Sequence, residues 1–235
     1  MTHEILIGWD SREKRAWQVC AASIIAHAKV PPAIRPIGMQ TLDGYYRRPT
    51  ERNDRGILFD SISNAPMSTE FALARFFAPI VGRARWVLFC DADFMFRADV
   101  QELFDLADNR YAVQVVKHEH HPHESQKMDG QRQTDYDRKN WSSLCLWNMR
   151  HAGNRRIWLD DANKQPGLWL HQFAWLKDHE IGELPAEWNW LDGTSDDTVD
   201  PKAVHFTRGT PDMVGWERTV FSYEWNRYDA RIASR

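Results

Sequence analysis

Residues 86–96 read WVLFCDADFMF, and this stretch decides the fold class. Five apolar or aromatic residues precede two acids, Asp91 and Asp93. The run is too short for a core helix and is bounded by turn residues, which favours a fully buried central strand. A second D-x-D triplet occurs at Asp135/Asp137. The acids alone are therefore weak evidence, and their place after a buried strand has to decide whether they form a site.

The flanking sequence predicts an α/β fold. Residues 4–8 (EILIG) are expected to form a short buried strand, and residues 12–28 show apolar side chains at helical spacing, with Ser11 as the N-cap. Pro31 and Pro32 end that helix, and residues 33–38 (AIRPIG) supply the next strand. Strand, helix and strand in this order predict a mostly parallel central sheet flanked by helices.

The rest of the chain continues the alternation within one domain, residues 1–235. Helices are expected from Ser68 over residues 68–82 (STEFALARFFAPIVG), over 100–107 with Asp99 as the cap, over 166–179 and near 216–235. Further strands are expected at 111–117, 143–147, 181–185 and 203–207. Residues 43–56 should be a polar loop, and residues 118–140 a long, mobile one.

Composition narrows the class of protein. The chain has 43% hydrophobic residues and a net charge of -3, so it lacks the strong positive charge typical of a nucleic-acid binder. Its three cysteines lie apart in apolar stretches and are expected to be reduced core residues. Neither a signal peptide nor an apolar run of about 18 residues is seen, which predicts a cytoplasmic protein and leaves peripheral membrane association open. The 12 tryptophans suggest a carbohydrate ligand, because indole faces stack on sugar rings.

Asp91 and Asp93 are candidate metal ligands. Residues i and i+2 of a strand point the same way, and ligands bind beyond the carboxyl ends of strands in open α/β sheets. Two such carboxylates repel each other unless a cation lies between them, and their oxygens suit Mn²⁺ or Mg²⁺. The alternative is a turn in which both acids cap backbone groups.

Two other residues strengthen the metal hypothesis. Arg75 is the one charge between Phe71 and Gly82, so it needs a carboxylate or phosphate partner, which a structural ion pair would also provide. His205 ends another expected strand and precedes Arg208 and Gly209; a neutral imidazole there could complete a metal site, although a lone histidine is more often structural. The histidines at 118, 120, 121 and 123 have no regular zinc-site spacing and favour a solvated loop.

Taken in order, these pieces resemble a GT-A-fold glycosyltransferase, close to family 8 and to related bacterial enzymes of surface-polysaccharide synthesis. The matching stretches are ILIGWDSREKRAWQVCAASI (5–24), STEFALARF (68–76), WVLFCDADFMF (86–96), LPAEWNW (184–190) and AVHFTRGTP (203–211). They keep the family's order over residues 5–211, so the resemblance covers most of the chain.

The resemblance implies a role for each matched residue. Asp91, Ala92 and Asp93 match the D-x-D that binds manganese and the ribose–diphosphate, and His205 matches the third protein ligand of the metal. Gly8, Trp9 and Asp10 are expected to contact the nucleotide base, and Arg75 the nucleotide. Arg208 and Gly209 are expected to contact the phosphates, with Arg208 in place of the family's lysine. Family 8 has D-Q-D where this chain has His171-Gln172-Phe173, so Gln172 alone keeps the polar group expected beneath the anomeric carbon.

The sequence therefore predicts a metal-dependent transferase that moves a sugar from a nucleotide-sugar, most simply a UDP-sugar, to an acceptor hydroxyl of a carbohydrate or lipid-linked acceptor. Retention of configuration is implied only by the resemblance. Two alternatives stay open. A nucleotidyltransferase would need a glycine-rich loop after the first strand, and WDSREK has no glycine. A non-catalytic sugar or nucleotide binder would need no metal ligands.

Overall fold

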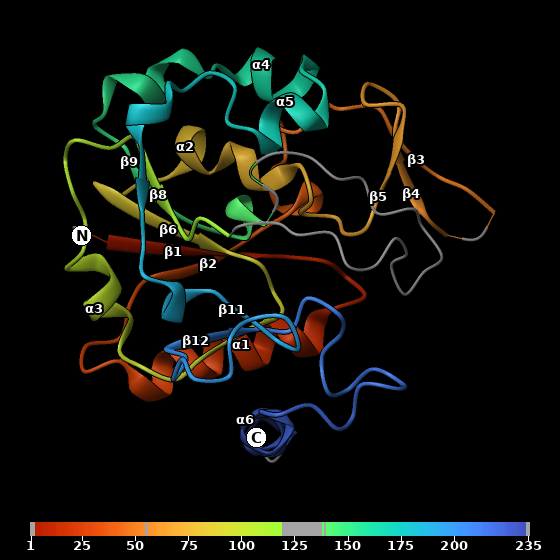
Figure 1. Ribbon diagram of the computed structural model, residues 1–235. Coiled ribbons are helices and arrows are strands. Elements are labelled where there is room, and N and C mark those ends of the chain that lie inside the picture. Colours follow the sequence, from red (N-terminus) through yellow and green to blue (C-terminus); the bar gives the residue numbers. More distant parts are fainter. Residues whose placement is uncertain (1–2, 55, 119–137, 139, 234–235) are drawn as a thin grey trace.

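The computed structural model describes residues 3–54, 56–118, 138 and 140–233, and a six-stranded sheet forms its centre (Figure 1). The strand order is β10-β8-β9-β6-β1-β2, and strand β9 is antiparallel to both of its neighbours while the other pairs are parallel. The strands are β1 (His3–Gly8), β2 (Ile34–Ile37), β6 (Trp86–Cys90), β8 (Val113–Val115), β9 (Leu144–Asn148) and β10 (Ile181–Glu183). The expected mostly parallel α/β sheet is confirmed, with WVLFC as one of its central strands.

Two three-stranded sheets extend from this centre. One is an antiparallel meander of β3 (Thr50–Arg52), β4 (Leu58–Asp60) and β5 (Ala65–Met67). The other joins β7 (Phe94–Phe96), β12 (Ala203–His205) and β11 (Trp190–Leu191), with β12 in the middle. Strand β7 of this second sheet directly follows the Asp91–Asp93 turn. Its pairing with β12 places the C-terminal part of the protein next to the two acids.

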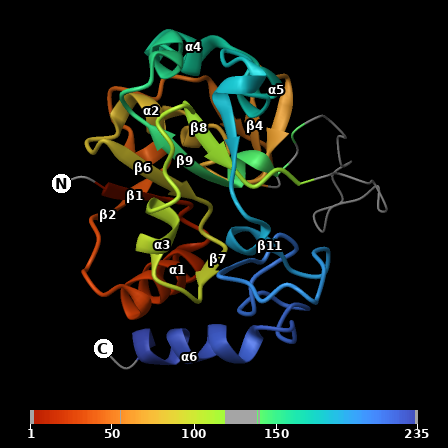
Figure 2. The same cartoon turned by 60° about the vertical axis from the view of Figure 1, so that its left-hand side comes forward.

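Helices cover both faces of the central sheet. The α-helices are α1 (Lys14–His27), α2 (Ala78–Val81), α3 (Val100–Phe104), α4 (Leu159–Lys164), α5 (Gly167–His171) and α6 (Ser222–Ala233). The 3₁₀ helices are η1 (Met39–Thr41), η2 (Ala74–Phe77), η3 (Trp141–Ser143), η4 (Ala152–Arg156), η5 (Asp178–Glu180) and η6 (Ala186–Trp188). Helices α2, α4 and α5 lie on one side of the sheet, α1 lies on the other, and α6 lies outside α1 (Figures 1 and 2).

The alternation of side chains along the strands explains these two layers. Leu6 and Phe89 point into the cluster beneath α2, α4 and α5, whereas Ile5, Ile7 and Leu88 point into the cluster beneath α1 and α3. Successive strand residues face opposite sides, so a strand covered on both faces must be apolar throughout. This is why WVLFC reads as one continuous apolar run.

Several sequence expectations are confirmed, including the cap of α3 and the free cysteines. The Asp99 carboxylate accepts a hydrogen bond from the backbone N–H of Gln101, as an N-cap does. Cys20, Cys90 and Cys145 are buried and free. Within the described ranges, no helix is long and apolar enough to cross a bilayer.

Other local expectations are wrong. Ser11 does not cap α1, because this helix begins after Glu13 and has no side-chain cap. The Ser11 hydroxyl donates instead to Glu70, 59 residues away. The expected loop 43–56 contains β3, because the strand pairs across a hairpin with β4.

Four expected helices are shorter than their apolar patterns, among them α3, which ends at Phe104 instead of residue 107. Residues 68–73 are turns, and helical structure begins only at Ala74. Helix α5 ends at His171, before Phe173 with its positive φ of 49°, and the C-terminal helix begins at Ser222 rather than near Trp216. The mobile loop expected near 118–140 falls mostly on residues 119–137 and 139, which lie outside the described residues.

Candidate metal and donor site

Asp91 and Asp93 lie in the turn that joins β6 to β7. Strand β6 ends at Cys90 and β7 begins at Phe94, so neither acid belongs to a strand and the i, i+2 argument from the sequence is wrong in detail. The turn nevertheless brings the two carboxylates together at the carboxyl edge of β6. Its backbone is fixed by the Asp91 N–H, which donates to the Ser143 carbonyl at 2.9 Å.

His205 reaches the same place through strand pairing. Strand β12 is antiparallel to β7 with His205 opposite Phe94, and the backbone N–H of Phe206 donates to the Asp93 carbonyl at 3.0 Å. The imidazole stacks on the Phe94 ring, with centroids 4.3 Å apart. As a result, His205 Nε2 lies 3.3 Å from Asp93 Oδ1. One ligand atom each from Asp91, Asp93 and His205 lies within 4.8 Å of the others, and we call these three residues the trio.

Asn189 fixes the orientation of the imidazole. This residue is fully buried, and its Oδ1 lies 3.0 Å from His205 Nδ1 while its Nδ2 donates to Ser143 Oγ at 2.9 Å. Because Oδ1 can only accept, Nδ1 donates to it, and this contact turns Nε2 toward Asp93. Partners of this kind orient metal-binding histidines in proteins.

Arg75 compensates part of the negative charge. Its Nη1 lies 2.9 Å from Asp91 Oδ1 and donates to the Ser142 carbonyl at 3.0 Å. The guanidinium lies 5.5 Å from the ring centroid of Phe71 and 5.3 Å from that of Phe89. Phe71 comes from the apolar stretch around Arg75 and Phe89 from strand β6, and the carboxylate partner of Arg75 is Asp91.

The charge balance of the trio fits a divalent cation. Burial raises the pKa of Asp91 to about 7; the Arg75 charge opposes this shift and the Asp93 charge adds to it. Asp91 Oδ1 has Arg75 Nη1 at 2.9 Å and Asp93 Oδ1 has His205 Nε2 at 3.3 Å, and neither buried oxygen has a further hydrogen-bond partner within the described part of the chain. Two carboxylates and an imidazole gathered in this way form a donor set that suits Mn²⁺ or Mg²⁺.

The residues expected at the nucleotide base follow strand β1. Strands β1 and β6 are parallel, with Ile7 opposite Cys90, so Gly8 ends at the same sheet edge as Asp91. A Cβ at Gly8 would lie 2.7 Å from the Phe71 ring, so glycine permits the close packing here. Trp9 is partly buried and packs edge-on against Trp17.

Asp10 holds the loop after β1. Its carboxylate has no exposed surface and accepts hydrogen bonds from Arg12 N, Nε and Nη2 and from the Glu70 N–H, at 2.7–3.0 Å. Burial opposes ionisation, but the bonds from Arg12 and Glu70 outweigh it and lower the pKa of Asp10. The base contact that the resemblance implies for Asp10 stays a prediction, and it would require this loop to rearrange.

Three further expected residues lie around the trio. Ala92 is fully buried between the two acids. Arg208 is stacked on Trp216 at 5.1 Å and lies 3.7 Å from Asp192, with 44% of its side chain exposed. Gly209 has a φ of 147°, and a Cβ there would meet the Trp216 indole at 2.6 Å, so this turn requires glycine.

Gln172 lies at the carboxyl end of α5, where its backbone carbonyl accepts from Arg138. The neighbouring His171 is 2.9 Å from Ser142 Oγ, and the Ser142 carbonyl accepts from Arg75. The Gln172 position is therefore connected to the trio through Ser142 and Arg75, and its catalytic role stays a prediction.

Of the four histidines at 118–123 only His118 is described; burial lowers its pKa to about 4.

Sequence reasoning missed Asn189 and Glu13. Asn189 lies in the matched stretch LPAEWNW, but a buried amide that bridges Ser143 and His205 is visible only in three dimensions. Glu13 precedes α1, and burial, followed by the charges of Asp93 and Asp10, raises its pKa to about 8. Glu13 therefore adds a further acid close to the trio.

The chain is similar in sequence to a curated plant protein. The chain is 42% identical over 229 residues to Protein CDI of Arabidopsis thaliana, covering 94% of this chain and 83% of that protein. No family model matches the chain.

Solved structures identify the fold. Similar ones are apo WbbM, a bifunctional glycosyltransferase (TM-score 0.57, 17% identity), apo GlyE of Streptococcus pneumoniae TIGR4 (0.60, 14%) and the galactosyltransferase LgtC with donor and acceptor sugar analogues (0.56, 14%). Each match covers 97% of this chain, but the chain spans only 50% of WbbM and 60% of GlyE, against 95% of LgtC. The chain therefore has the GT-A fold of glycosyltransferases.

Proposed function

This chain belongs to the family of Protein CDI of Arabidopsis thaliana, and from its GT-A fold and its trio we propose that it is a metal-dependent glycosyltransferase. It would move a sugar from a nucleotide-sugar, in the first instance a UDP-sugar, to an acceptor hydroxyl. The observation that carries the proposal is the convergence of Asp91, Asp93 and His205 within 4.8 Å at the carboxyl edge of the sheet. Ligands bind at this edge in open α/β sheets.

The trio would hold Mn²⁺ or Mg²⁺ through two carboxylate oxygens and His205 Nε2. A bound divalent ion would neutralise the negative charge that develops on the departing diphosphate. Asn189 keeps Nε2 of the imidazole directed at the carboxylates, so the ring needs little reorientation on binding.

Positively charged side chains support a diphosphate at this edge. Arg75 lies beside Asp91, and Arg208, three residues after His205 in the chain, keeps 44% of its side chain exposed. A planar guanidinium matches phosphate oxygens in a bidentate manner. Arg75 and Arg208 would bind and orient the diphosphate, while Gly8 and Trp9 border the position of the base.

The acceptor, in this proposal, is a carbohydrate or a lipid-linked saccharide. Retention of the anomeric configuration belongs to the proposal as well, with Gln172 beneath the anomeric carbon. The proton spectrum of the first product formed would decide the configuration, because α- and β-linked anomeric protons differ in their coupling constants.

The decisive experiment is product analysis with the purified protein, Mn²⁺ and a panel of UDP-, GDP- and CMP-sugars. A transferase releases the free nucleotide, which is UDP from a UDP-sugar, and does so more slowly after Asp93→Asn. In a parallel incubation with UTP and a sugar phosphate, release of pyrophosphate would indicate a nucleotidyltransferase. Binding of nucleotide-sugars without any turnover would indicate a non-catalytic binder, and the proposal would be wrong.

A further inference from the structure

The small sheet β3–β4–β5 has two different faces. On one face Arg52, Leu58 and Met67 stand opposite each other in register, and Leu58 and Met67 are buried in the core. In the next row Glu51 pairs with Phe59 and Phe59 with Pro66, so these three side chains share the opposite face. That face is partly or fully exposed at each of the three positions.

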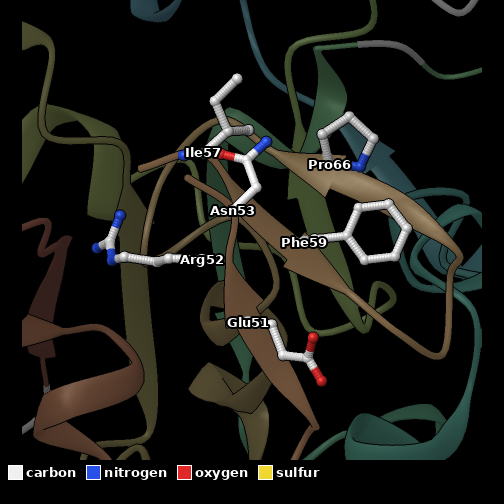
Figure 3. A pocket seen from close by; sticks show the side chains of 6 residues that line it. All are labelled: Glu51, Arg52, Asn53, Ile57, Phe59 and Pro66. Atoms are coloured by element: carbon white, nitrogen blue, oxygen red, sulfur yellow. Dashed lines mark hydrogen bonds between the residues drawn. The ribbon is translucent and has the colours of Figure 1, made fainter. Parts of the chain in front are cut away.

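A hollow lies beside the β3–β4 turn and is lined by residues of this outer face together with Arg52 of the other face. Its volume is about 390 Å³, and Figure 3 shows the side chains around it. The lining residues are Glu51, Arg52, Asn53, Ile57, Phe59 and Pro66. A volume of this order lies within the range of small-molecule sites. The hollow combines an aromatic ring and two apolar side chains with a carboxylate, a guanidinium and an amide.

This mixture of groups matches a sugar ring better than a purely apolar or purely ionic ligand. One face of a pyranose presents C–H groups that pack on an aromatic ring such as Phe59. Its hydroxyls donate to a carboxylate such as Glu51 and bond to amide groups. A phosphate would be repelled by Glu51, and a lipid chain would leave the carboxylate without a polar partner.

The hollow is anchored to the edge of the central sheet that carries the trio. Arg52 Nη2 donates to Glu70 Oε1 at 2.6 Å, and the Glu70 N–H donates to Asp10 Oδ2 at 2.9 Å. Ser11, next to Asp10, also donates to Glu70 from its backbone and its hydroxyl. Asp10 follows β1, whose carboxyl end adjoins that of β6, and Figure 1 shows β3–β5 beyond this edge.

We propose that the hollow over Glu51, Phe59 and Pro66 is a subsite for a pyranose unit of the acceptor. The inference rests on the proposed function, since only a transferase needs an acceptor. Phe59 and Pro66 supply the stacking surface, and Glu51 selects a ring with hydroxyls on the side that faces it. The ion pair of Arg52 with Glu70 fixes the sheet relative to the loop after β1.

Saturation-transfer NMR tests the subsite without metal or nucleotide. The probes are the methyl α- and β-pyranosides of glucose, galactose and mannose, each at millimolar concentration. At least one of them should receive saturation from the wild-type protein. Phe59→Ala should weaken that binding by about tenfold, and Glu51→Gln should weaken it less because it keeps one acceptor oxygen. Tyr223→Ala, which removes an exposed aromatic ring on α6, should leave it unchanged.

The affinity for Mn–UDP distinguishes a failure of the proposed subsite from a failure of the proposed transferase function. Both hollow variants should bind Mn–UDP within about twofold of wild type, because they leave the trio intact. If wild type binds no pyranoside, or if Phe59→Ala and Glu51→Gln bind as wild type does, the subsite is refuted while the transferase proposal stands. If wild type binds pyranosides through Phe59 but releases no nucleotide from any donor, the sugar site stands and the transferase proposal is refuted.

Discussion

The Nδ1 atom of His205 lies 3.0 Å from Oδ1 of the fully buried Asn189. This contact connects two parts of the site, because Asn189 also bonds Ser143 Oγ, and the Ser143 carbonyl holds the backbone of Asp91. A continuous set of hydrogen bonds thus joins the backbone at the first acid to the imidazole that faces the second. The backbone at Asp91 and the imidazole of His205 are therefore held relative to each other by the fold itself.

Asn189→Ala should weaken Mn²⁺ binding by roughly 10–100-fold, the usual effect of removing the partner of a ligating histidine. The change leaves Ser143 Oγ and His205 Nδ1 without this partner, and it should also lower the free energy of unfolding by about 1–3 kcal/mol. Calorimetric titration with Mn²⁺ measures the first effect, and the ¹⁵N shifts of His205 should show loss of the single Nδ1-protonated tautomer.

Asn163→Ala is the matched control. Asn163 is also buried and bonds the carbonyls of Tyr45 and Leu159, in the layer that contains α4. It should cost similar stability and leave Mn²⁺ affinity unchanged. Equal losses of metal affinity in both variants would mean that Asn189 acts only through stability.

Arg75→Ala should reduce both UDP affinity and stability. It removes the partner of Asp91 and leaves a buried carboxylate uncompensated, which typically costs about 3–5 kcal/mol. Arg75→Lys should restore only part of the UDP affinity, because an ammonium keeps the charge but lacks the planar fork that can hold two phosphate oxygens at once. Arg85→Ala, at an exposed arginine bonded to Asn109, serves as the control. Full UDP affinity in the alanine variant would contradict the role of Arg75 in the nucleotide site.

Acid should destabilise the protein through Asp60. Arg48 and Asp60 form a fully buried ion pair; burial opposes ionisation of Asp60, but hydrogen bonds from Arg48 and Ser63 outweigh it and lower its pKa. A lowered pKa stabilises the folded state at pH values above about 4, where the unfolded carboxyl is ionised, and this contribution is lost as the pH falls through the folded pKa. Urea unfolding between pH 3 and 7 measures it.

Ser63→Ala gives a mild test of this pair. It removes one donor to Asp60, so the folded pKa should rise toward the unfolded value; the variant should be less stable at pH 7 and should lose less stability between pH 7 and pH 3 than wild type. Parallel stability curves for the two proteins from pH 3 to 7 would show that Asp60 does not govern acid unfolding.

The sequence predicts the elements whose formation depends on neighbouring residues. The WVLFC strand, the Asp99 cap and the α1 periodicity are local signals, and the structure has all three. Asp91, Asp93 and His205 could be selected because each follows or ends an apolar run, and the structure brings them together. The mostly parallel sheet followed from the order of strands and helices.

The errors occur where distant residues determine the local structure. Ser11 has the right chemistry for an N-cap, but Glu70 binds its hydroxyl across 59 residues. Phe71 lies in an apolar pattern typical of a helix, yet its ring packs against Gly8 within a turn segment. Asn189 could not be assigned to the site because its two partners, Ser143 and His205, lie 46 and 16 residues away along the chain.

The most direct test of the central claim is calorimetric titration of UDP into Asp93→Asn with and without Mn²⁺. Wild type should bind UDP far more tightly in Mn²⁺ than in EDTA, and Asp93→Asn should lose at least about tenfold of that affinity in Mn²⁺ while changing little in EDTA. Asp160→Asn, at an exposed aspartate on α4, should behave as wild type. If Mn²⁺ raises the UDP affinity of Asp93→Asn by as much as it raises that of wild type, a metal site at the trio is contradicted.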